Sequence, residues 1–177
     1  EYPQGKKIKF LYMGRVMAEK GVNELFEAMK RLIKDGIDCE LDIIGTFEEN
    51  YKEEVKRYEL DGWLHYHGYQ KDVRPYIEKC HCIVLPSWHE GMSNTNLEGA
   101  SSGRPVITSC VSGCKESVIN GKTGFIFEKK NKNDLYRVMR EFIFLSYEKK
   151  KEMGVEGRKY MQKVFDRKKV IERTLLY

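Results

Sequence analysis

The sequence predicts an α/β fold built on a doubly wound parallel sheet, and three observations support this prediction. Short apolar runs alternate with segments whose apolar residues recur at helical spacing. The run CIVLPS at residues 82–87 is continuously apolar, as expected of a strand that is covered on both faces of its sheet. The segments between successive runs are long enough for crossover helices, which allow the strands to lie parallel.

The first part of the chain predicts two strand–helix pairs. Residues 7–14, KIKFLYMG, form an apolar-rich run that ends at a glycine. Residues 21–36 follow, with apolar residues on one helical face and a glycine as the stop signal. Residues 39–45, CELDIIG, repeat the strand pattern, and the more polar residues 50–62 predict the second helix.

The middle of the chain continues the alternation. Residues 63–69, WLHYHGY, predict a short strand, and residues 72–80 predict a brief helix with a proline near its first turn. After the buried strand at 82–87, residues 95–103 predict a helix that a glycine closes. Residues 104–110, RPVITSC, predict the fifth strand.

The last part of the chain predicts one more strand and several helices. Residues 120–127, NGKTGFIF, predict a tight turn into a sixth strand. Residues 133–146 and 147–165 predict two helices, and residues 167–177 predict a final helical stub. Because there is no internal repeat and no low-complexity segment, we expect residues 1–177 to form one Rossmann-like domain.

The composition excludes several classes of protein. With 41% hydrophobic and 33% charged residues, the chain is typical of a soluble globular domain rather than a disordered or fibrous one. No apolar run approaches the ~20 residues that span a bilayer. The opening EYPQGKKIKF looks like a linker ahead of a strand and not like a signal peptide, so we expect the chain to begin inside a longer protein.

The net charge of +5 is a mild positive excess. The lysine-rich runs at 128–132 and 148–152 are typical of solvated helix faces, with attraction to an anionic substrate or an anionic membrane surface as the alternative. Aromatic base-stacking motifs interleaved with basic residues are absent, so we expect no nucleic-acid partner.

The cysteines and histidines predict no metal site and no disulfide framework. The five cysteines are odd in number and irregularly spaced. We expect buried free thiols in a reducing cytoplasm, including Cys82 and Cys110, which lie in apolar runs. His65 and His67 point to one strand face, but the sequence offers no third ligand beside them.

The loop GRVMAEKG at 14–21 is the first of three that follow predicted strands, at the sheet edge where ligands bind in this class of fold. Gly14 permits a sharp turn, and Arg15 then projects from the strand end. Lys20 precedes a helix start, where the helix dipole disfavours a cation, so we expect an anion near it. A guanidinium fork and an ammonium group suit a diphosphate, and the alternative is two solvated surface cations.

The stretch EGMSNTNLE at 90–98 is the second such loop. Thr95 and Glu98 have the spacing of a capping box, with Thr95 at the N-cap and Glu98 at N3. That interpretation leaves Glu90, Gly91 and residues 92–94 without a role. Gly91 allows close backbone approach, and free amides at a helix start bind anions. We therefore expect Glu90 to reach a sugar beyond the phosphates, and Glu98, if free of capping, to accept from ribose hydroxyls.

Other motifs carry less information. SGCKESV at 112–118 is a third small-residue loop that says little by itself. GKT at 121–123 is not a phosphate-binding P-loop, because Glu116 stands where that motif needs glycine. The fingerprint G-x-G-x-x-G follows no predicted strand, which disfavours a nicotinamide or flavin enzyme.

Three stretches together, YMGRVMAEKGV, LPSWHEGMSNTNLEGASSGRPVI and GCKESVINGKTGFIF, resemble the C-terminal domain of family 4 glycosyltransferases in order and spacing. These are retaining enzymes of the two-domain GT-B fold. The pair Glu90 and Glu98 is the most specific part of the resemblance. The second stretch is also similar to enzymes of bacterial capsule, exopolysaccharide and lipopolysaccharide assembly.

The resemblance implies a role for each matching residue. Arg15 and Lys20 match the cations on the donor diphosphate, and Gly14 matches the glycine beneath it. Glu90 matches the glutamate that contacts the transferred sugar, and Glu98 matches the one that holds the ribose. The remaining donor-binding matches are Gly91, Met92, Ser93, Asn94 and Thr95 near the phosphates or sugar, and Gly68 and Tyr69 near the base. Family members generally need no metal and no separate cofactor.

The resemblance also implies what this chain lacks. A complete member has an N-terminal domain that holds the acceptor, and its last helix commonly crosses back to that domain. We therefore expect the donor-binding half of a glycosyltransferase that takes a nucleotide diphosphate sugar, with UDP-sugars favoured, and passes the sugar to a glycan or lipid-linked acceptor. The full enzyme is expected in the cytoplasm with peripheral association at the inner face of the membrane, and the fragment alone is expected to be inactive.

Two other interpretations stay open. A sugar-nucleotide epimerase shares the two-domain architecture and would release an epimerised sugar nucleotide without any acceptor. A Rossmann-like module for protein interaction would bind no nucleotide at all. His89, which precedes Glu90, has no assigned role.

Overall fold

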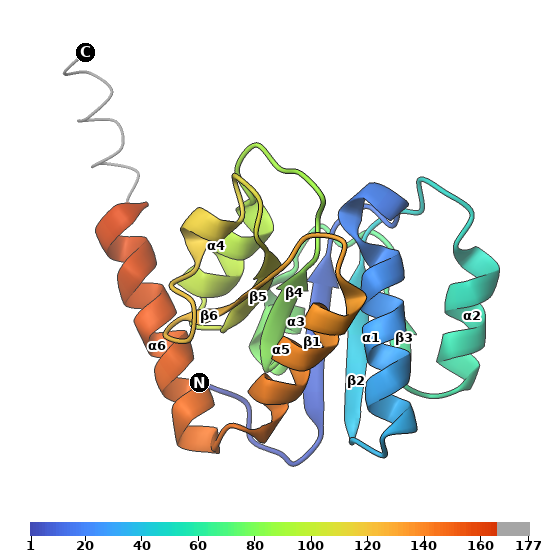
Figure 1. Cartoon of the computed structure of the whole chain (residues 1–177), viewed down its shortest axis with the longest axis horizontal. Helices are drawn as coiled ribbons and strands as arrows, with labels where there is room; N and C mark the ends of the chain where they lie inside the picture. Colours follow the sequence, from blue (N-terminus) through green and yellow to red (C-terminus); the bar gives the residue numbers. More distant parts are fainter. Residues whose placement is uncertain (166–177) are drawn as a thin grey trace.

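The predicted strands assemble into one six-stranded sheet in which every neighbouring pair is parallel (Figure 1). The computed structural model describes residues 1–165. The strand order is β3-β2-β1-β4-β5-β6. The strands are Ile8–Met13 (β1), Cys39–Ile44 (β2), Leu64–Tyr66 (β3), Cys82–Leu85 (β4), Val106–Ser109 (β5) and Gly124–Phe127 (β6). The predicted α/β fold with a doubly wound sheet is confirmed.

Every helix predicted within the described residues is present, and each end lies within about two residues of its predicted position. The helices are Val22–Lys34 (α1), Lys52–Leu60 (α2), Arg74–Lys79 (α3), Asn94–Ser101 (α4), Lys132–Phe144 (α5) and Tyr147–Val164 (α6), with 3₁₀ turns at Ala18–Lys20 (η1) and Lys115–Ser117 (η2). The predicted helical stub at 167–177 lies outside the described residues.

The sheet separates two apolar cores, and β1 contributes side chains to both. Successive strand side chains point to opposite faces. Phe10 and Tyr12 pack into one core with side chains of α1, α2 and α5. Leu11 and Met13 pack into the other with side chains of α3, α4 and α6. The strand is therefore buried on both faces, and Figure 1 shows α1 and α5 together in front of the sheet.

Helix α1 illustrates how local signals set element boundaries. Leu25, Met29 and Leu32 recur at helical spacing and are fully buried. The helix begins after Gly21, whose φ of 72° is left-handed, and Gly36, with a φ of 72°, follows its end. The predicted glycine stop is confirmed.

The prediction of buried free thiols holds for four of the five cysteines. All five cysteines are free, and four are buried, but Cys110 is exposed. It is exposed because β5 ends at Ser109, one residue earlier than the apolar pattern indicated. His67 lies 2.5 Å from Asp42, and among residues 1–165 no group of three potential ligands could hold a metal ion.

The order of the strands determines where a ligand site can form. β1 lies between β2 and β4, so the chain leaves β1 toward one side of the sheet and later returns on the other. The loops after β1 and β4 diverge at this switch point and open a crevice at the carboxyl ends of the strands. Within residues 1–165, no helix combines the length and the apolar character needed to cross a bilayer.

Candidate functional site

Two adjoining pockets lie at this switch point. The first, called here the charged pocket, has a volume of about 270 Å³. It is lined by Met13, Gly14, Arg15, Lys20, Leu85, Glu90, Met92, Ser93, Asn94 and Thr95. The second, called here the apolar pocket, has a volume of about 340 Å³ and is lined by Met13, Gly14, Arg15, Ile44, Gly45, Thr46, Tyr69, Gln70, Val73 and Thr95. The apolar pocket is within the range of roughly 300–1,000 Å³ that is typical of small-molecule sites, and the charged pocket extends it.

The loop after β1 forms the floor shared by both pockets. Gly14 donates its backbone N–H to the carbonyl of Ile44 at 2.9 Å, which keeps the loop close to β2. The Tyr12 hydroxyl donates a hydrogen bond to the carbonyl of Arg15 at 2.6 Å. This bond holds the backbone turn after β1 against the strand. Burial, with the charge of Glu90 as a smaller cause, raises the pKa of Tyr12, so this hydroxyl stays protonated and remains a donor.

Lys20 reaches the charged pocket because the loop after β1 returns across the end of β4. Gly21 lies so close to Pro86 that a Cβ at this position would sit 2.0 Å from the Pro86 carbonyl oxygen. The backbone N–H of Trp88 donates to the carbonyl of Glu19 at 2.9 Å. These contacts bring η1 beside the segment that carries Glu90.

Lys20 and Glu90 form an ion pair inside the charged pocket. Nζ of Lys20 lies 2.5 Å from Oε1 of Glu90, and the two side chains are only 18% and 16% exposed. The hydroxyl of Ser87 donates to the same oxygen at 2.8 Å. Lys20 is therefore not a solvated surface cation, and the negative charge beside it in the structure is that of Glu90.

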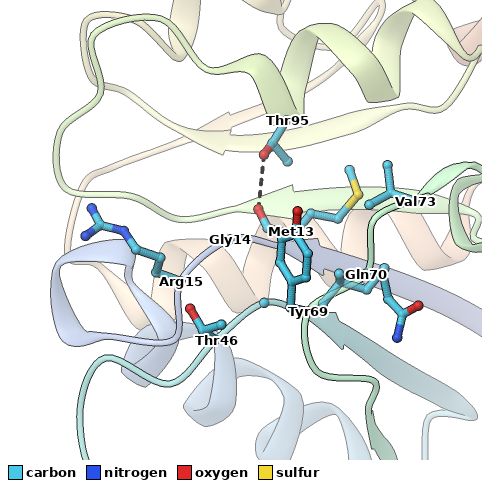
Figure 2. A pocket seen from close by; sticks show the side chains of 10 residues that line it. Met13, Gly14, Arg15, Thr46, Tyr69, Gln70, Val73 and Thr95 are labelled. Atoms are coloured by element: carbon cyan, nitrogen blue, oxygen red, sulfur yellow. Dashed lines mark hydrogen bonds between the residues drawn. The ribbon is translucent and has the colours of Figure 1, made fainter.

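Arg15 lies at the rim of the same pocket. Its side chain is exposed, and within residues 1–165 no carboxylate lies within ion-pair distance of it. Figure 2 shows its guanidinium on one side of Met13, with Gln70 and Val73 on the other side. Arg15 is thus placed to meet an anion that enters from solvent.

The start of α4 differs from the predicted capping box. Ser93, not Thr95, is the N-cap, and its hydroxyl accepts from the backbone N–H of Asn96 at 3.1 Å. Thr95 instead donates to the carbonyl of Met13 at 3.0 Å, the bond drawn in Figure 2. Glu98 therefore stands beyond N3 and takes no part in capping. The prediction was wrong because a contact with β1 engages the Thr95 hydroxyl.

The loop at 112–118, to which the sequence analysis assigned no role, packs against the residues that line the charged pocket. Gly113 accepts a hydrogen bond from the backbone N–H of Ser93 at 2.8 Å. A Cβ on Gly113 would lie 2.4 Å from the carbonyl oxygen of Gly91 and 2.6 Å from that of Glu90. The glycine therefore sets how closely this loop approaches the residues before α4.

The apolar pocket lies between the loops after β2 and β3. Gly68, with a φ of 64°, accepts from the backbone N–H of Gly45 at 2.9 Å and turns the chain after β3. Tyr69 follows and is 74% exposed at the pocket wall. The Gln70 amide donates to the carbonyl of His67 at 2.7 Å. The pocket thus has an open aromatic wall beside a fixed polar side chain.

Glu98 lies outside both pockets. It is exposed and lines a third pocket between α3 and α4, together with Lys71, Asp72, Val73, Arg74, Ile77, Ser101 and Ser102. Val73 lines both this third pocket and the apolar pocket, so the two adjoin. The structure therefore gathers Arg15, Lys20 and Glu90 in the charged pocket, and it places Glu98 in the third pocket, which adjoins the apolar pocket.

Cys114 is a buried free thiol close to the site. Burial raises the pKa of Cys114, which keeps the thiol protonated near neutral pH. The sequence did not single out Ser87 or Gly113, nor pocket-lining residues such as Thr46, Gln70 and Val73. Ser87 precedes Glu90 by three residues and donates a hydrogen bond to its carboxylate. The sequence alone does not indicate this contact, because it depends on the conformation of the loop.

Comparison with known proteins gives consistent results. A family model described as glycosyl transferases group 1 matches residues 2–160. A glycosyltransferase of Methanocaldococcus jannaschii, named as uncharacterized, is 31% identical over 169 residues, which are 92% of this chain and 45% of that relative. A capsular polysaccharide biosynthesis glycosyltransferase of Staphylococcus aureus is 32% identical over 121 residues, 67% of this chain and 32% of that relative. The chain thus spans less than half the length of either relative.

The solved structures show the same fold. The Staphylococcus aureus protein TarM superposes with a TM-score of 0.87 over 99% of this chain and 36% of its own, at 19% identity. At this identity the likeness supports the fold alone.

Proposed function

The chain belongs to the group 1 glycosyltransferases, and we propose that it is the donor-binding, C-terminal half of a retaining enzyme with the GT-B fold. The observation that carries this proposal is the meeting of Arg15, Lys20 and Glu90 with the start of α4 in one pocket at the switch point of the sheet. We expect this pocket to bind the diphosphate and sugar of a nucleotide diphosphate sugar.

The diphosphate is assigned to the cations and the helix start. Lys20 and Arg15 supply an ammonium group and a planar guanidinium fork on the same pocket wall. The backbone N–H groups of the first turn of α4, at Asn94 and Thr95, add the positive end of the helix dipole. These groups can offset the negative charge of the leaving diphosphate, so the proposal needs no metal.

The nucleoside is assigned to the apolar pocket and the pocket beyond it. Gly68 turns the chain so that Tyr69 and Gln70 face the space beside the charged pocket. A base there would lie against the exposed ring of Tyr69, and stacking of this kind tolerates several bases. Glu98, released from capping, would accept hydrogen bonds from the ribose hydroxyls. The TarM structure was solved with UDP, which favours uridine as the first nucleoside to test.

The proposed reaction transfers the sugar with its anomeric configuration kept. The bond between the anomeric carbon and the diphosphate oxygen breaks, and its electron pair goes to that oxygen. An acceptor hydroxyl attacks from the same face, and its proton passes to the departing diphosphate. The acceptor, a glycan or lipid-linked sugar, would be held by the N-terminal domain of the full-length enzyme, working in the cytoplasm at the inner face of the membrane.

Melting temperatures in the presence of nucleotides test the proposal. UDP, GDP, ADP and their glucose or mannose esters would be added to the chain at graded concentrations. A ligand at about ten times its Kd stabilises by about 1.4 kcal/mol, which raises the melting temperature by about 3–6 °C for a chain of this size. A shift with none of these nucleotides would contradict the proposal and favour a Rossmann-like interaction module.

A further inference from the structure

The charged pocket contains a carboxylate where the proposed ligand is an anion. Glu90 is held by two donors at a single oxygen, since Lys20 Nζ lies 2.5 Å from Oε1 and Ser87 Oγ lies 2.8 Å from it. Within residues 1–165 both contacts use Oε1, so Oε2 remains able to accept a hydrogen bond from a ligand hydroxyl.

Contacts of the surrounding structure hold this carboxylate in the pocket. Ser87 is fully buried, and its carbonyl accepts a hydrogen bond from the Ser109 hydroxyl. Behind Glu90, the backbone of Gly113 lies in close contact with the carbonyls of Glu90 and Gly91. We therefore expect the negative charge of Glu90 to stay in the pocket when a ligand binds.

A phosphate that binds Lys20 must lie near this charge. A charge-assisted N–H···O bond to Lys20 would be about 2.7–2.9 Å long. Adding the 2.5 Å between Nζ and Oε1 places the phosphate oxygen no farther than about 5.4 Å from the carboxylate oxygen. Two like charges at this separation repel each other appreciably in a partly buried site.

The repulsion differs between donor and product. The terminal phosphate of a free nucleoside diphosphate carries roughly −1.5 to −2 charge near pH 7, whereas a phosphate esterified to a sugar carries about −1. The sugar ester also brings hydroxyls that Oε2 of Glu90 can accept. The carboxylate of Glu90 thus weakens the binding of a free nucleoside diphosphate more than the binding of a sugar-linked one.

We propose that Glu90 sets the preference of this site for the nucleotide diphosphate sugar over the free nucleoside diphosphate, by placing a fixed negative charge beside the terminal phosphate. This inference rests on the proposed function and adds a specificity role to it. After transfer, the extra charge on the product lies beside Glu90, which favours product release and exchange for a new donor.

Calorimetry on the full chain tests the inference with three uridine probes. The probes are UDP, UDP-glucose and a UDP whose terminal phosphate is blocked as a methyl ester, which has the charge of the donor without its sugar. Glu90→Gln should improve UDP binding by about tenfold relative to UDP-glucose and to the methyl ester. Glu19→Gln is the matched control, because that carboxylate is 53% exposed and does not line either pocket.

The outcomes separate this inference from the proposed function. If the relative affinities for the three probes are the same in Glu90→Gln and wild type, the specificity role is wrong, while nucleotide binding itself would still support the proposed function. A wild-type chain that binds UDP much more tightly than its methyl ester would also overturn the inference, even if the variant failed to fold. If the wild-type chain binds no uridine probe and none of the matching guanosine probes, the proposed function fails as well.

Discussion

Lys20 and Glu90 are 70 residues apart in sequence, yet Nζ of the lysine lies 2.5 Å from Oε1 of the glutamate. The pair links the loop after β1 to the loop after β4, which are the two loops that diverge at the switch point. It also explains how a lysine is tolerated beside the start of α1, because the carboxylate supplies the compensating negative charge.

The contact of Gly113 with the backbone of Glu90 and Gly91 predicts a strong steric effect. Gly113→Ala should destabilise the chain by about 3 kcal/mol or more, because it combines a left-handed φ of 82° with Cβ contacts of 2.4 and 2.6 Å. Gly62→Ala is the matched control, since its φ is 79° and nothing lies within 4 Å of its Cβ. Urea denaturation measures both, and we expect the control to lose only about 1–2 kcal/mol. Equal losses in the two variants would mean that the close approach is not maintained.

The observed N-cap of α4 predicts which substitutions affect stability. Ser93→Ala should cost about 1 kcal/mol, because the Ser93 hydroxyl accepts from the backbone N–H of Asn96. Glu98→Ala should destabilise the chain by less than about 0.5 kcal/mol, because this exposed side chain does not cap the helix. Denaturation without ligand compares the two. The reverse order of effects would restore the capping box that the sequence indicated.

His81 predicts how stability depends on pH. Burial, together with the positive charges of Lys150, Lys9 and Arg104, lowers the pKa of His81 from 6.5 to about 4. The folded chain therefore holds this imidazole neutral, while the unfolded chain protonates it near pH 6.5. The contribution of His81 to stability should be constant above that pH and fall by up to about 3 kcal/mol as the pH drops from 6.5 to 4.

The substitution His81→Asn isolates this contribution. The His81 ring accepts from the backbone N–H of Lys9 through Nδ1 at 3.0 Å, and an asparagine oxygen can replace that acceptor without titrating. Urea midpoints between pH 7 and 5 should then fall less steeply in the variant than in the wild type. Parallel pH profiles would show that another group causes the loss.

The fold and the general position of the candidate site could be predicted from the sequence, because both depend on the order of apolar strand and helix patterns along the chain. Apolar periodicity gave the strands and helices, and the carboxyl ends of parallel strands share one edge of a sheet. Residues that follow different strands, such as Arg15 and Glu90, were therefore expected to meet, and both line the charged pocket.

The details that the sequence could not predict depend on tertiary partners. Ser93 and Thr95 are both good N-cap residues, and only the position of the Met13 carbonyl decides that Thr95 is used elsewhere. The supporting role of Gly113 depends on a backbone approach between two loops. The hydrogen bond from Ser87 to Glu90 likewise depends on the conformation of the loop after β4.

Calorimetry with UDP on an Arg15→Ala, Lys20→Ala double variant is the most direct test of the diphosphate assignment. Two charge-assisted contacts contribute about 1.5–3 kcal/mol each, so UDP affinity should fall by about a hundredfold or more. A Lys6→Ala, Lys34→Ala variant removes the same charge from exposed positions before β1 and at the end of α1, and it should bind UDP as the wild type does. Undiminished UDP binding in the Arg15, Lys20 double variant would contradict the assignment of this pocket to a diphosphate.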